Sequence, residues 1–365
     1  MFGKAYREGG YDFTSYLLSA EALLKGTNPY TVDTPYPYIY PLFLASVLTP
    51  FTLLPYSINN FLWFFINVGS FGFSVYLLLK IYFKMSPSKQ VFLFVLFFMV
   101  IVLFSPIQIH LLNGQVNFLV ILFCTLFIYW NDRNNKLSSL FLAFAISLKI
   151  VPLVFLIFLF IEKKYKDILL TIVFSFISVF VLPFLFAGIK TIDYYSYYFD
   201  HFIINAFSTN LSDNSIAVYF TLTGFITSFF VSLKSFGIYL QIISAVIILS
   251  PIVYLHHRLL KENIFQKNLL LFSLYSLSVL LISPSSQTHH LVFIIPAIFW
   301  IIINFYEKID KEKRWYIFYY MLVFALFWAG NIFKHSPLIF ISIITLFIIT
   351  FIISQKKIRL ANEKI

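Results

Sequence analysis

Long, uninterrupted apolar runs dominate this chain and predict helices that cross a membrane. A crossing helix needs about 20 largely apolar residues, although shorter runs also occur. The runs are continuous, as in VFLFVLFFMVIVLF, whereas β-barrel strands alternate apolar and polar residues. The pattern therefore predicts an all-α, polytopic transmembrane protein. Nine runs are expected to cross: Ile58–Phe83, Val91–Phe104, Val116–Trp130, Ile168–Ala187, Phe236–Leu255, Leu269–Ser283, Leu291–Phe305, Trp315–Gly330 and Leu338–Ser354.

Tyr40–Pro55 is apolar but is interrupted by Pro41, Pro50 and Pro55. Proline lacks the backbone N–H that a helix interior needs, and its ring clashes with the preceding turn. We therefore expect this segment to form an interfacial or re-entrant piece rather than a crossing helix.

Leu137–Ile161 is long enough to cross, but Lys149 and Pro152 lie near its middle. Each half would reach only about 17 Å at the helical rise per residue. Two interpretations are open, a single kinked crossing or a re-entrant hairpin whose two ends lie on the same side.

The basic residues of the connecting loops distinguish these two interpretations. Cytoplasmic loops carry an excess of Lys and Arg. Placing every basic cluster in the cytoplasm requires the hairpin, and also requires that Ser215–Val231 does not cross fully. The clusters are Lys80/Lys84/Lys89, Arg133/Lys136, Lys163/Lys164/Lys166, Arg258/Lys261/Lys267, Lys308/Lys311/Lys313/Arg314 and Lys356/Lys357/Arg359.

With those two choices, nine crossings lead from an outer N-terminal region to an inner C-terminus. The outer segments then hold most of the unusual polar residues, so an active site would face outward. These segments are Met1–Tyr38, Ser105–Gln115, Gly188–Asn214, Pro284–His290 and Asn331–Pro337.

Composition supports a single membrane domain, which we expect in the cell membrane. Only 11% of the residues are charged and 60% are hydrophobic, too few charges to cover a soluble domain of this size. We expect residues 1–57 to form an outer loop and juxtamembrane segment, residues 58–354 the helix bundle, and residues 355–365 a cytoplasmic tail. The net charge of +11 comes from clusters between apolar runs, so no nucleic-acid partner is expected. The single cysteine, Cys124, excludes an intrachain disulfide.

Asp12 lies among aromatic residues just before membrane-associated structure. A carboxylate in such a place is a candidate general base with a tuned pKa. The alternative is an N-cap for a helix over Phe13–Leu24, because Asp is a favoured capping residue. On spacing alone the cap is favoured.

Two cationic candidates follow later in the chain. Lys149 lies in the middle of an apolar stretch, where an ammonium group is costly unless it is paired, hydrated or snorkelling, and such a cation suits a lipid phosphate. His289 and His290 end the sequence SPSSQTHH directly before an apolar run. Anion binding at a helix start and a plain interfacial loop are equally supported for them. No metal site is expected, since adjacent histidines rarely ligate one ion and no cysteine or acidic cluster accompanies them.

The remaining polar candidates are amides and hydroxyls. Asn113, Gln115 and Asn117 open a crossing helix in NGQVN. They either bind sugar hydroxyls or cap the helix, and capping is favoured when the motif is taken in isolation. Asn210 and Ser212 belong to a second polar cluster, which is a weak signal by itself.

The order of these motifs resembles glycosyltransferase family 87. The sequence presents YDF, then GTNPY with Tyr30, a YPL segment, NGQVN, a short apolar helix with a central lysine, an N-x-x-S loop and SPSSQTHH. The resemblance covers about residues 11–300. It implies the GT-C architecture, an outward-facing site and a polyprenyl-phosphate sugar donor. It also implies a metal-independent, inverting transfer of a hexose, expected to be mannose, to a lipid or glycan acceptor.

Carried onto this chain, the resemblance makes Asp12 the general base on the acceptor hydroxyl. One of His289 and His290 would contact the donor phosphate, with Lys149 as a helper. No cofactor is implied. The chain departs from the family pattern at Gln287, where an aromatic residue is usual, and it has only eleven residues before Asp12 where relatives carry a helix. We therefore expect such a helix upstream of Asp12.

Two other classes of function compete with this interpretation. A transporter or flippase for a lipid-linked glycan would share the apolar helices and the membrane-level cations, although inverted repeats typical of transporters are not visible. A structural or assembly subunit is favoured only if Asp12 lacks its preceding helix.

Overall fold

The structure is a computed structural model that describes residues 11–34, 36–83, 88–204, 220–260, 267–283, 286–307, 323–330 and 336–362. Within these ranges all regular secondary structure is helical, as the sequence predicted. Contacts divide the chain into two compact units, which are described separately. Unit 1 comprises Met1–Leu79, Pro106–Phe160 and Lys164–Asn205, and unit 2 comprises Lys80–Ser105, Ile161–Lys163 and Ala206–Ile365. The single membrane domain expected from the sequence remains a prediction, which this division into two units does not test.

Most helices of the first half belong to unit 1, although α4 and α9 end, and α6 begins, in unit 2. In chain order they are α2 (Tyr11–Leu24), η1 (Pro29–Thr31), α3 (Leu42–Leu48), η2 (Thr49–Leu53), α4 (Tyr56–Phe83), α6 (Phe104–Asn113), α7 (Asn117–Trp130), α8 (Asn135–Leu148), η3 (Val151–Val154), α9 (Phe155–Ile161), α10 (Tyr165–Phe176), η4 (Ile177–Val181), α11 (Leu182–Ala187), α12 (Lys190–Tyr198) and η5 (Phe199–Ile204).

Unit 2 holds the rest of the described helices. These are α5 (Lys89–Val102), α14 (Leu222–Phe229), η7 (Val231–Phe236), α15 (Gly237–Leu259), α16 (Lys267–Ile282), η8 (Thr288–Ile294), α17 (Ile295–Glu307), a helix at residues 323–330, and α19 (Ser336–Asn362).

Four helical stretches in the described ranges are long and apolar enough to cross a membrane. They are Tyr56–Tyr82, Tyr165–Ala187, Gly237–Leu259 and Pro337–Gln355, and in length and composition they match four of the nine predicted crossings. Helices α7 and α16, at 14 and 16 residues, are shorter than about 20 residues. Like the short apolar stretch Thr288–Ile301, they remain predictions as crossings. The predicted crossing Trp315–Gly330 lies mostly outside the described residues.

The region after Val91 differs from the prediction. Helix α5 ends at Val102, and the chain bends by 82° into α6, so the pair forms either one broken span or a re-entrant loop. The predicted outer loop Ser105–Gln115 is therefore largely helical. The reason is that Pro106 lies within the first turn of α6, where proline is tolerated, and Ile107 and His110 are buried.

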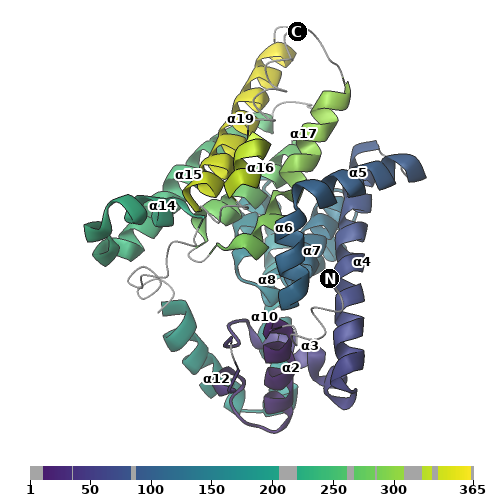
Figure 1. Cartoon of the computed structure of the whole chain (residues 1–365), viewed down its shortest axis with the longest axis vertical. Coiled ribbons are helices and arrows are strands. Elements are labelled where there is room, and N and C mark those ends of the chain that lie inside the picture. The colour runs from purple at the N-terminus through teal and green to yellow at the C-terminus, as the bar shows by residue number, and fades with distance from the viewer. Residues whose placement is uncertain are drawn as a thin grey trace. The chain divides into compact units, whose positions relative to one another are not determined.

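The proline-rich segment Tyr40–Pro55 does not cross, as predicted. It forms the short helices α3 and η2, and Pro50 lies in the first turn of η2. Seven residues of α3 extend only about 10 Å. Both pieces pack against α2, at the end of unit 1 where α12 also lies (Figure 1).

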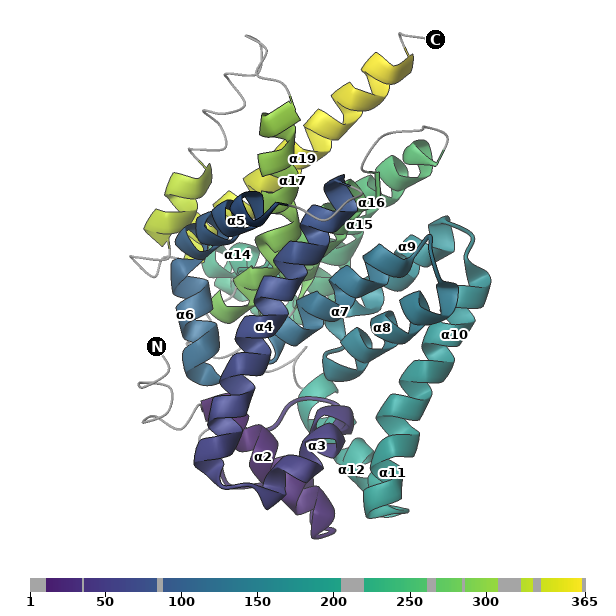
Figure 2. The same cartoon turned by 90° about the vertical axis from the view of Figure 1, so that its right-hand side faces the viewer.

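Leu137–Ile161 is broken at Lys149, whose extended backbone ends α8, and η3 begins at Val151 with Pro152 in its first turn. The two ends of the segment lie together, because Lys164 Nζ donates hydrogen bonds to Asp132 Oδ1 at 2.8 Å and to the Asn131 carbonyl at 2.9 Å. Helices α7 to α10 form one group in Figure 2. The contacts support the hairpin over the kinked crossing.

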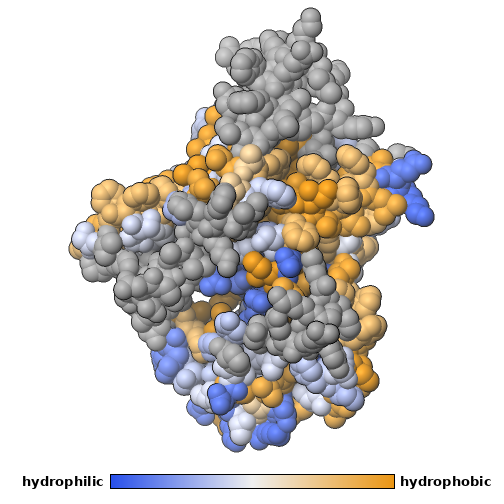
Figure 3. All heavy atoms as spheres, viewed as in Figure 1, coloured by the Kyte–Doolittle hydropathy of each residue, from blue (hydrophilic) through white to orange (hydrophobic). Residues whose placement is uncertain are grey.

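Surface hydropathy within unit 1 follows this arrangement. Hydrophilic residues gather where α2 and α12 lie, whereas hydrophobic residues cover the adjacent edge formed by α4 (Figure 3). Helix α4 exposes large apolar side chains such as Phe61, Phe65 and Phe73. Such a helix suits a hydrocarbon solvent.

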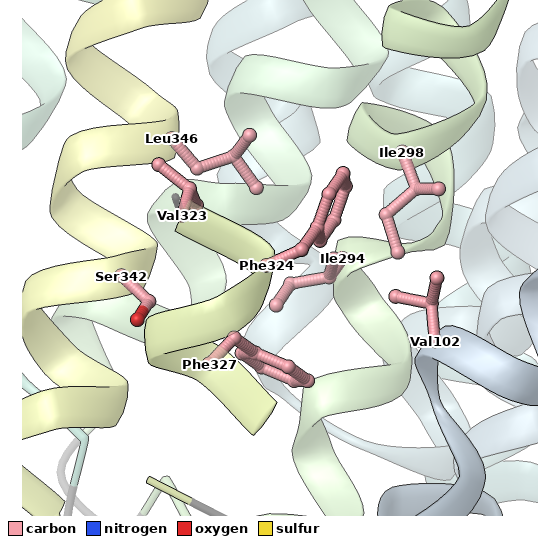
Figure 4. Close-up of a pocket in the computed structure, with 8 residues that line it drawn as sticks. All are labelled: Val102, Ile294, Ile298, Val323, Phe324, Phe327, Ser342 and Leu346. Atoms are coloured by element: carbon pink, nitrogen blue, oxygen red, sulfur yellow. The ribbon is translucent and has the colours of Figure 1, made fainter. Parts of the chain in front are cut away.

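Unit 2 contains a partly buried ionic cluster and an apolar pocket. Glu162 Oε1 lies 3.1 Å from His256 Nε2 and 3.0 Å from Lys267 Nζ. Burial raises the pKa of Glu162, but these hydrogen bonds and charges outweigh it and lower the pKa to about 2. The pocket is lined mainly by aliphatic and phenyl groups, including Ile298 and Phe327 (Figure 4).

Candidate active site

Asp12 lies in the first turn of α2 and is half-buried. The helix ends in a left-handed turn at Gly26 (φ +66°), whose N–H donates to the Leu23 carbonyl. Because α2 already begins at Tyr11, Asp12 is inside the helix rather than at its N-cap. The capping alternative, favoured on spacing alone, is therefore wrong, and the carboxylate is free to make tertiary contacts.

The partner of the Asp12 carboxylate is Gln115, which is 103 positions away in the sequence. Gln115 Nε2 donates a hydrogen bond to Asp12 Oδ2 at 2.6 Å. The other end of the same amide accepts from Tyr40, with the hydroxyl 3.1 Å from Oε1. Gln115 is buried, with 2% of its surface exposed. The three side chains form one hydrogen-bonded chain.

A tight turn between α6 and α7 places Gln115. Gly114 has a φ of +67°, and a Cβ atom there would lie 2.6 Å from the Cβ of Phe13. Only glycine accommodates both this left-handed backbone and the close approach of α2. The Gly114 carbonyl accepts from Trp63 Nε1 at 2.7 Å, and the Trp63 ring stacks on Phe13 at 5.0 Å between centroids. The neighbours of Gln115 and Asp12 are thus packed against each other.

Buried polar contacts support the turn from behind. The Gln115 N–H donates to the carbonyl of His110 at 3.1 Å. The His110 ring is fully buried, and its Nε2 lies 3.0 Å from Asn67 Oδ1. A buried network whose members are hydrogen-bonded favours one arrangement of the turn.

Lys149 lies at the tip of the hairpin and belongs to the same cluster. Its Nζ donates to Asn117 Oδ1 at 3.0 Å and lies 5.7 Å from the centroid of the Tyr40 ring. The Lys149 side chain is therefore held by a contact within unit 1. Asn117 is the first residue of α7. The sequence also allowed a helix-capping role for it, but its side-chain oxygen accepts a hydrogen bond from Lys149.

The pKa of Asp12 is raised from its ordinary value of 3.8 to about 6. Burial is the largest cause, and the hydrogen bond from Gln115 and the charge of Lys149 offset part of it. Asp12 lies outside the candidate crossing helices. A carboxylate with a pKa just below neutrality is ionised at pH 7 and is also a better proton acceptor than an ordinary aspartate.

His289 and His290 belong to unit 2. His290 is buried, with 8% of its surface exposed, and its Nδ1 accepts from the N–H of Gln287 at 2.9 Å. This bond fixes the ring at the start of η8, with the His289 ring 4.2 Å away between centroids. The contact gives His290 a capping role, and phosphate binding by either histidine stays a prediction.

The other predicted site residues have no described contact with the Asp12 carboxylate. Asn113 ends α6 and is half-buried beside Gly114. Tyr30 is buried behind the site, where its hydroxyl donates to the Tyr40 carbonyl at 3.0 Å. Asn210 and Ser212 lie outside the described residues. Among the described residues, no group of three or more His, Cys, Asp or Glu side chains is placed to hold a metal ion.

Sequence reasoning missed Tyr40 and Trp63 as parts of the site. Tyr40 was visible only as the residue before Pro41, in a segment assigned to the membrane interface. Trp63 lies inside a predicted crossing helix, where nothing in the pattern marks an indole N–H that supports the NGQVN turn.

The helical fold, its candidate crossing helices and the half-buried acid beside an amide and an ammonium group define a polytopic membrane protein with an enzyme-like site. Residues 38–284 match glycosyltransferase family 87. Because the match covers more than half of the chain, this protein belongs to that family and is a membrane glycosyltransferase. The matched range contains Gln115, Asn117 and Lys149, whereas Asp12 precedes it and His289 and His290 follow it. No curated protein and no solved structure matches the chain.

Proposed function

We propose that this glycosyltransferase moves a hexose, in particular mannose, from a polyprenyl-phosphate donor to a lipid or glycan acceptor. The reaction takes place on the outer face of the cell membrane and inverts the anomeric carbon. The observation that carries this proposal is the partly buried Asp12, with its pKa raised to about 6, in one cluster with Gln115 and Lys149. The sugar, the polyprenyl donor and the outward orientation rest on the family resemblance and on the distribution of basic loops.

One base suffices for this chemistry. The acceptor oxygen attacks the anomeric carbon while the bond from that carbon to the phosphate oxygen breaks. The acceptor proton passes to the Asp12 carboxylate, and the bonding electron pair leaves with the polyprenyl phosphate. Inverting transfer needs no enzyme nucleophile, whereas retention by double displacement needs one.

The leaving phosphate gains negative charge in the transition state and must be stabilised. A positioned cation does this most effectively where water is excluded. We assign this role to Lys149. A contact of one of His289 and His290 with the donor phosphate is proposed from the family resemblance alone. The hydrogen bond from Lys149 Nζ to Asn117 Oδ1 positions the ammonium group.

The remaining predicted residues are proposed to contact the sugar or the acceptor. Amide and hydroxyl groups bind hydroxyl-rich ligands through directional hydrogen bonds. The proposed substrate contacts are Asn113, Asn210 and Ser212. Asn117 and Tyr30 are buried and already hydrogen-bonded to protein groups, so as substrate contacts they remain predictions from the sequence.

The proposal is tested by supplying radiolabelled polyprenyl-phosphate-mannose to membranes that contain the protein and to matched membranes without it. We expect label to move into a lipid or glycan product only where the protein is present. Polyprenyl-phosphate-glucose, supplied in parallel, tests the choice of sugar. If label never leaves the donor by transfer or hydrolysis, and the donor crosses sealed vesicles instead, the protein is a flippase and the proposal is wrong.

A further inference from the structure

Gln115 occupies an unusual place for a residue expected to bind sugar. Both ends of its amide are engaged by protein groups, and 2% of its surface is exposed. A side chain that reads substrate hydroxyls must offer them a free donor or acceptor. The first donor and the first acceptor of this amide are already taken by Asp12 and Tyr40.

We propose that Gln115 is a positioning residue that holds the Asp12 carboxylate in the orientation needed to accept the acceptor proton. This inference deepens the proposed function and rests on it. Gln115 binds Oδ2, and within the part of the chain that the structure describes no hydrogen bond to Oδ1 is seen, so we assign Oδ1 to the acceptor hydroxyl.

Tyr40 decides which way the amide points. A glutamine side chain has one oxygen and one nitrogen end, and a flipped amide would aim its oxygen at the carboxylate. The Tyr40 hydroxyl donates to Oε1 and so keeps Nε2 directed at Asp12. The position of Tyr40 is fixed in turn, because its backbone carbonyl accepts from Tyr30 and its ring packs edge-on against Tyr16 at 5.1 Å.

The backbone beneath Gln115 is fixed as well. The Gly114 carbonyl is bonded to Trp63, and the Gln115 N–H is bonded to His110. A side chain anchored at its backbone and at both polar ends loses little further freedom when substrate binds. Preorganisation of this kind is what a positioned proton acceptor requires.

The charged group that acts on Asp12 is Lys149, and burial together with the charge of Asp12 in turn raises the pKa of the neighbouring Tyr16 and Tyr40. Lys149 and the Gln115 amide both favour the ionised carboxylate, whereas burial opposes it. Removal of the Gln115 donor should therefore raise the proton affinity of Asp12, while a second carboxylate at this position should raise it further.

The test is an infrared titration of full-length protein labelled with ¹³C in the aspartate carboxyl groups. The band that disappears in Asp12→Asn is assigned to Asp12. We expect Gln115→Leu to raise its titration midpoint by about 1 pH unit and Gln115→Glu to raise it more. The matched control is Gln90→Glu, at an exposed position at the start of α5, which adds the same charge and should leave the midpoint unchanged. A Gln115→Leu midpoint equal to that of the wild type overturns the inference.

Kinetics give a second readout. A positioning role predicts that Gln115→Leu lowers kcat by about 10-fold or more with KM within about 2-fold, whereas a sugar contact predicts a raised KM with kcat kept. The second result overturns the inference. If Gln115→Leu does not fold, the inference is tested with Tyr40→Phe and the near-isosteric Gln115→Glu. Both variants should raise the titration midpoint of Asp12. If the wild type transfers no sugar, the proposed function fails, and the titration still decides whether Gln115 controls Asp12.

Discussion

The chemistry of the site depends on how one carboxylate is surrounded. Asp12 is partly desolvated, which favours its protonated form, while Gln115 and Lys149 favour the ionised form. The balance leaves a base that is charged at neutral pH and still has appreciable proton affinity. An exposed aspartate would be ionised but weakly basic.

This balance predicts an acid limb in the pH profile. A carboxyl group with a pKa of about 6 is protonated below that pH, so it cannot accept the acceptor proton there. We expect kcat/KM for sugar transfer to fall by about 10-fold per pH unit below about pH 6, measured over a range in which the protein stays folded. A profile that stays level down to pH 5 would contradict the role of Asp12.

Gly114 gives a second prediction at this scale. Gly114→Ala places a Cβ atom in a left-handed backbone and 2.6 Å from the Cβ of Phe13, so α2 or the turn must move. We expect a loss of roughly 1–3 kcal/mol of stability together with a strong loss of transfer, measured by thermal unfolding in detergent and by activity. The matched control is Gly69→Ala in α4, where a Cβ meets no atom within 4 Å. Equal behaviour of the two variants would show that the close approach is unimportant.

Much of the site was predictable from polarity alone. Asp12, Gln115, Asn117 and Lys149 stand out because polar groups are costly in an apolar chain and need a reason to be there. Tyr40 and Trp63 could not be found in this way. With 48 Phe and 24 Tyr in the sequence, an aromatic residue provides no contrast, and its role depends on where its one polar atom points.

At the scale of elements, a break in a helix brings Lys149 to the site. Pro152 prevents α8 from continuing into α9, so Lys149 lies at the tip of a hairpin and not inside a crossing helix. Sequence reasoning left the two alternatives open until loop charge favoured the hairpin. The contact of Lys164 with Asp132 at its base agrees with that choice.

The hairpin predicts that both of its ends are reached from the same side of the membrane. Single cysteines at Arg133 and Lys166, both exposed, should react with a membrane-impermeant thiol reagent only when the cytoplasmic face is open to it. The native Cys124 is buried and serves as the background control. Labelling of the two sites from opposite faces would mean that the segment crosses the membrane.

The bend between α5 and α6 shows what hydropathy cannot predict. Val91–Phe104 is uniformly apolar. The residue at the bend is Leu103, and neither a proline nor a glycine in this run marks the turn. The bend occurs there because the helix ends locally at Leu103, with φ −102° and ψ 24°, and Ile107 and His110 are buried on the other side of it. The bend between α5 and α6 is therefore set by tertiary packing and not by the hydropathy of the run.

For the whole molecule, the fold class followed from composition, whereas the number of crossings did not. Continuous apolar runs and few charges suffice to predict an all-helical membrane protein. Helix length and bending depend on packing, as the 14-residue α7 shows. The predicted orientation of the chain rests on loop charge, which biases membrane insertion and does not depend on side-chain contacts.

That orientation predicts a cytoplasmic C-terminus, because Lys356, Lys357 and Arg359 follow the last crossing helix. A fluorescent protein fused after Ile365 should fluoresce in cells, since it folds in the cytoplasm, and an alkaline phosphatase fused at the same point should be inactive. The reverse pattern would turn the basic loops outward and would place the candidate site on the inner face.

The central claim is that Asp12 accepts the proton of the sugar acceptor. The most direct measurement is single-turnover transfer from polyprenyl-phosphate-mannose by Asp12→Asn, with donor binding measured on the same preparation. We predict a loss of at least about 100-fold in the transfer rate with donor binding kept, because asparagine preserves the shape but cannot take up the proton. A transfer rate close to that of the wild type would contradict the account.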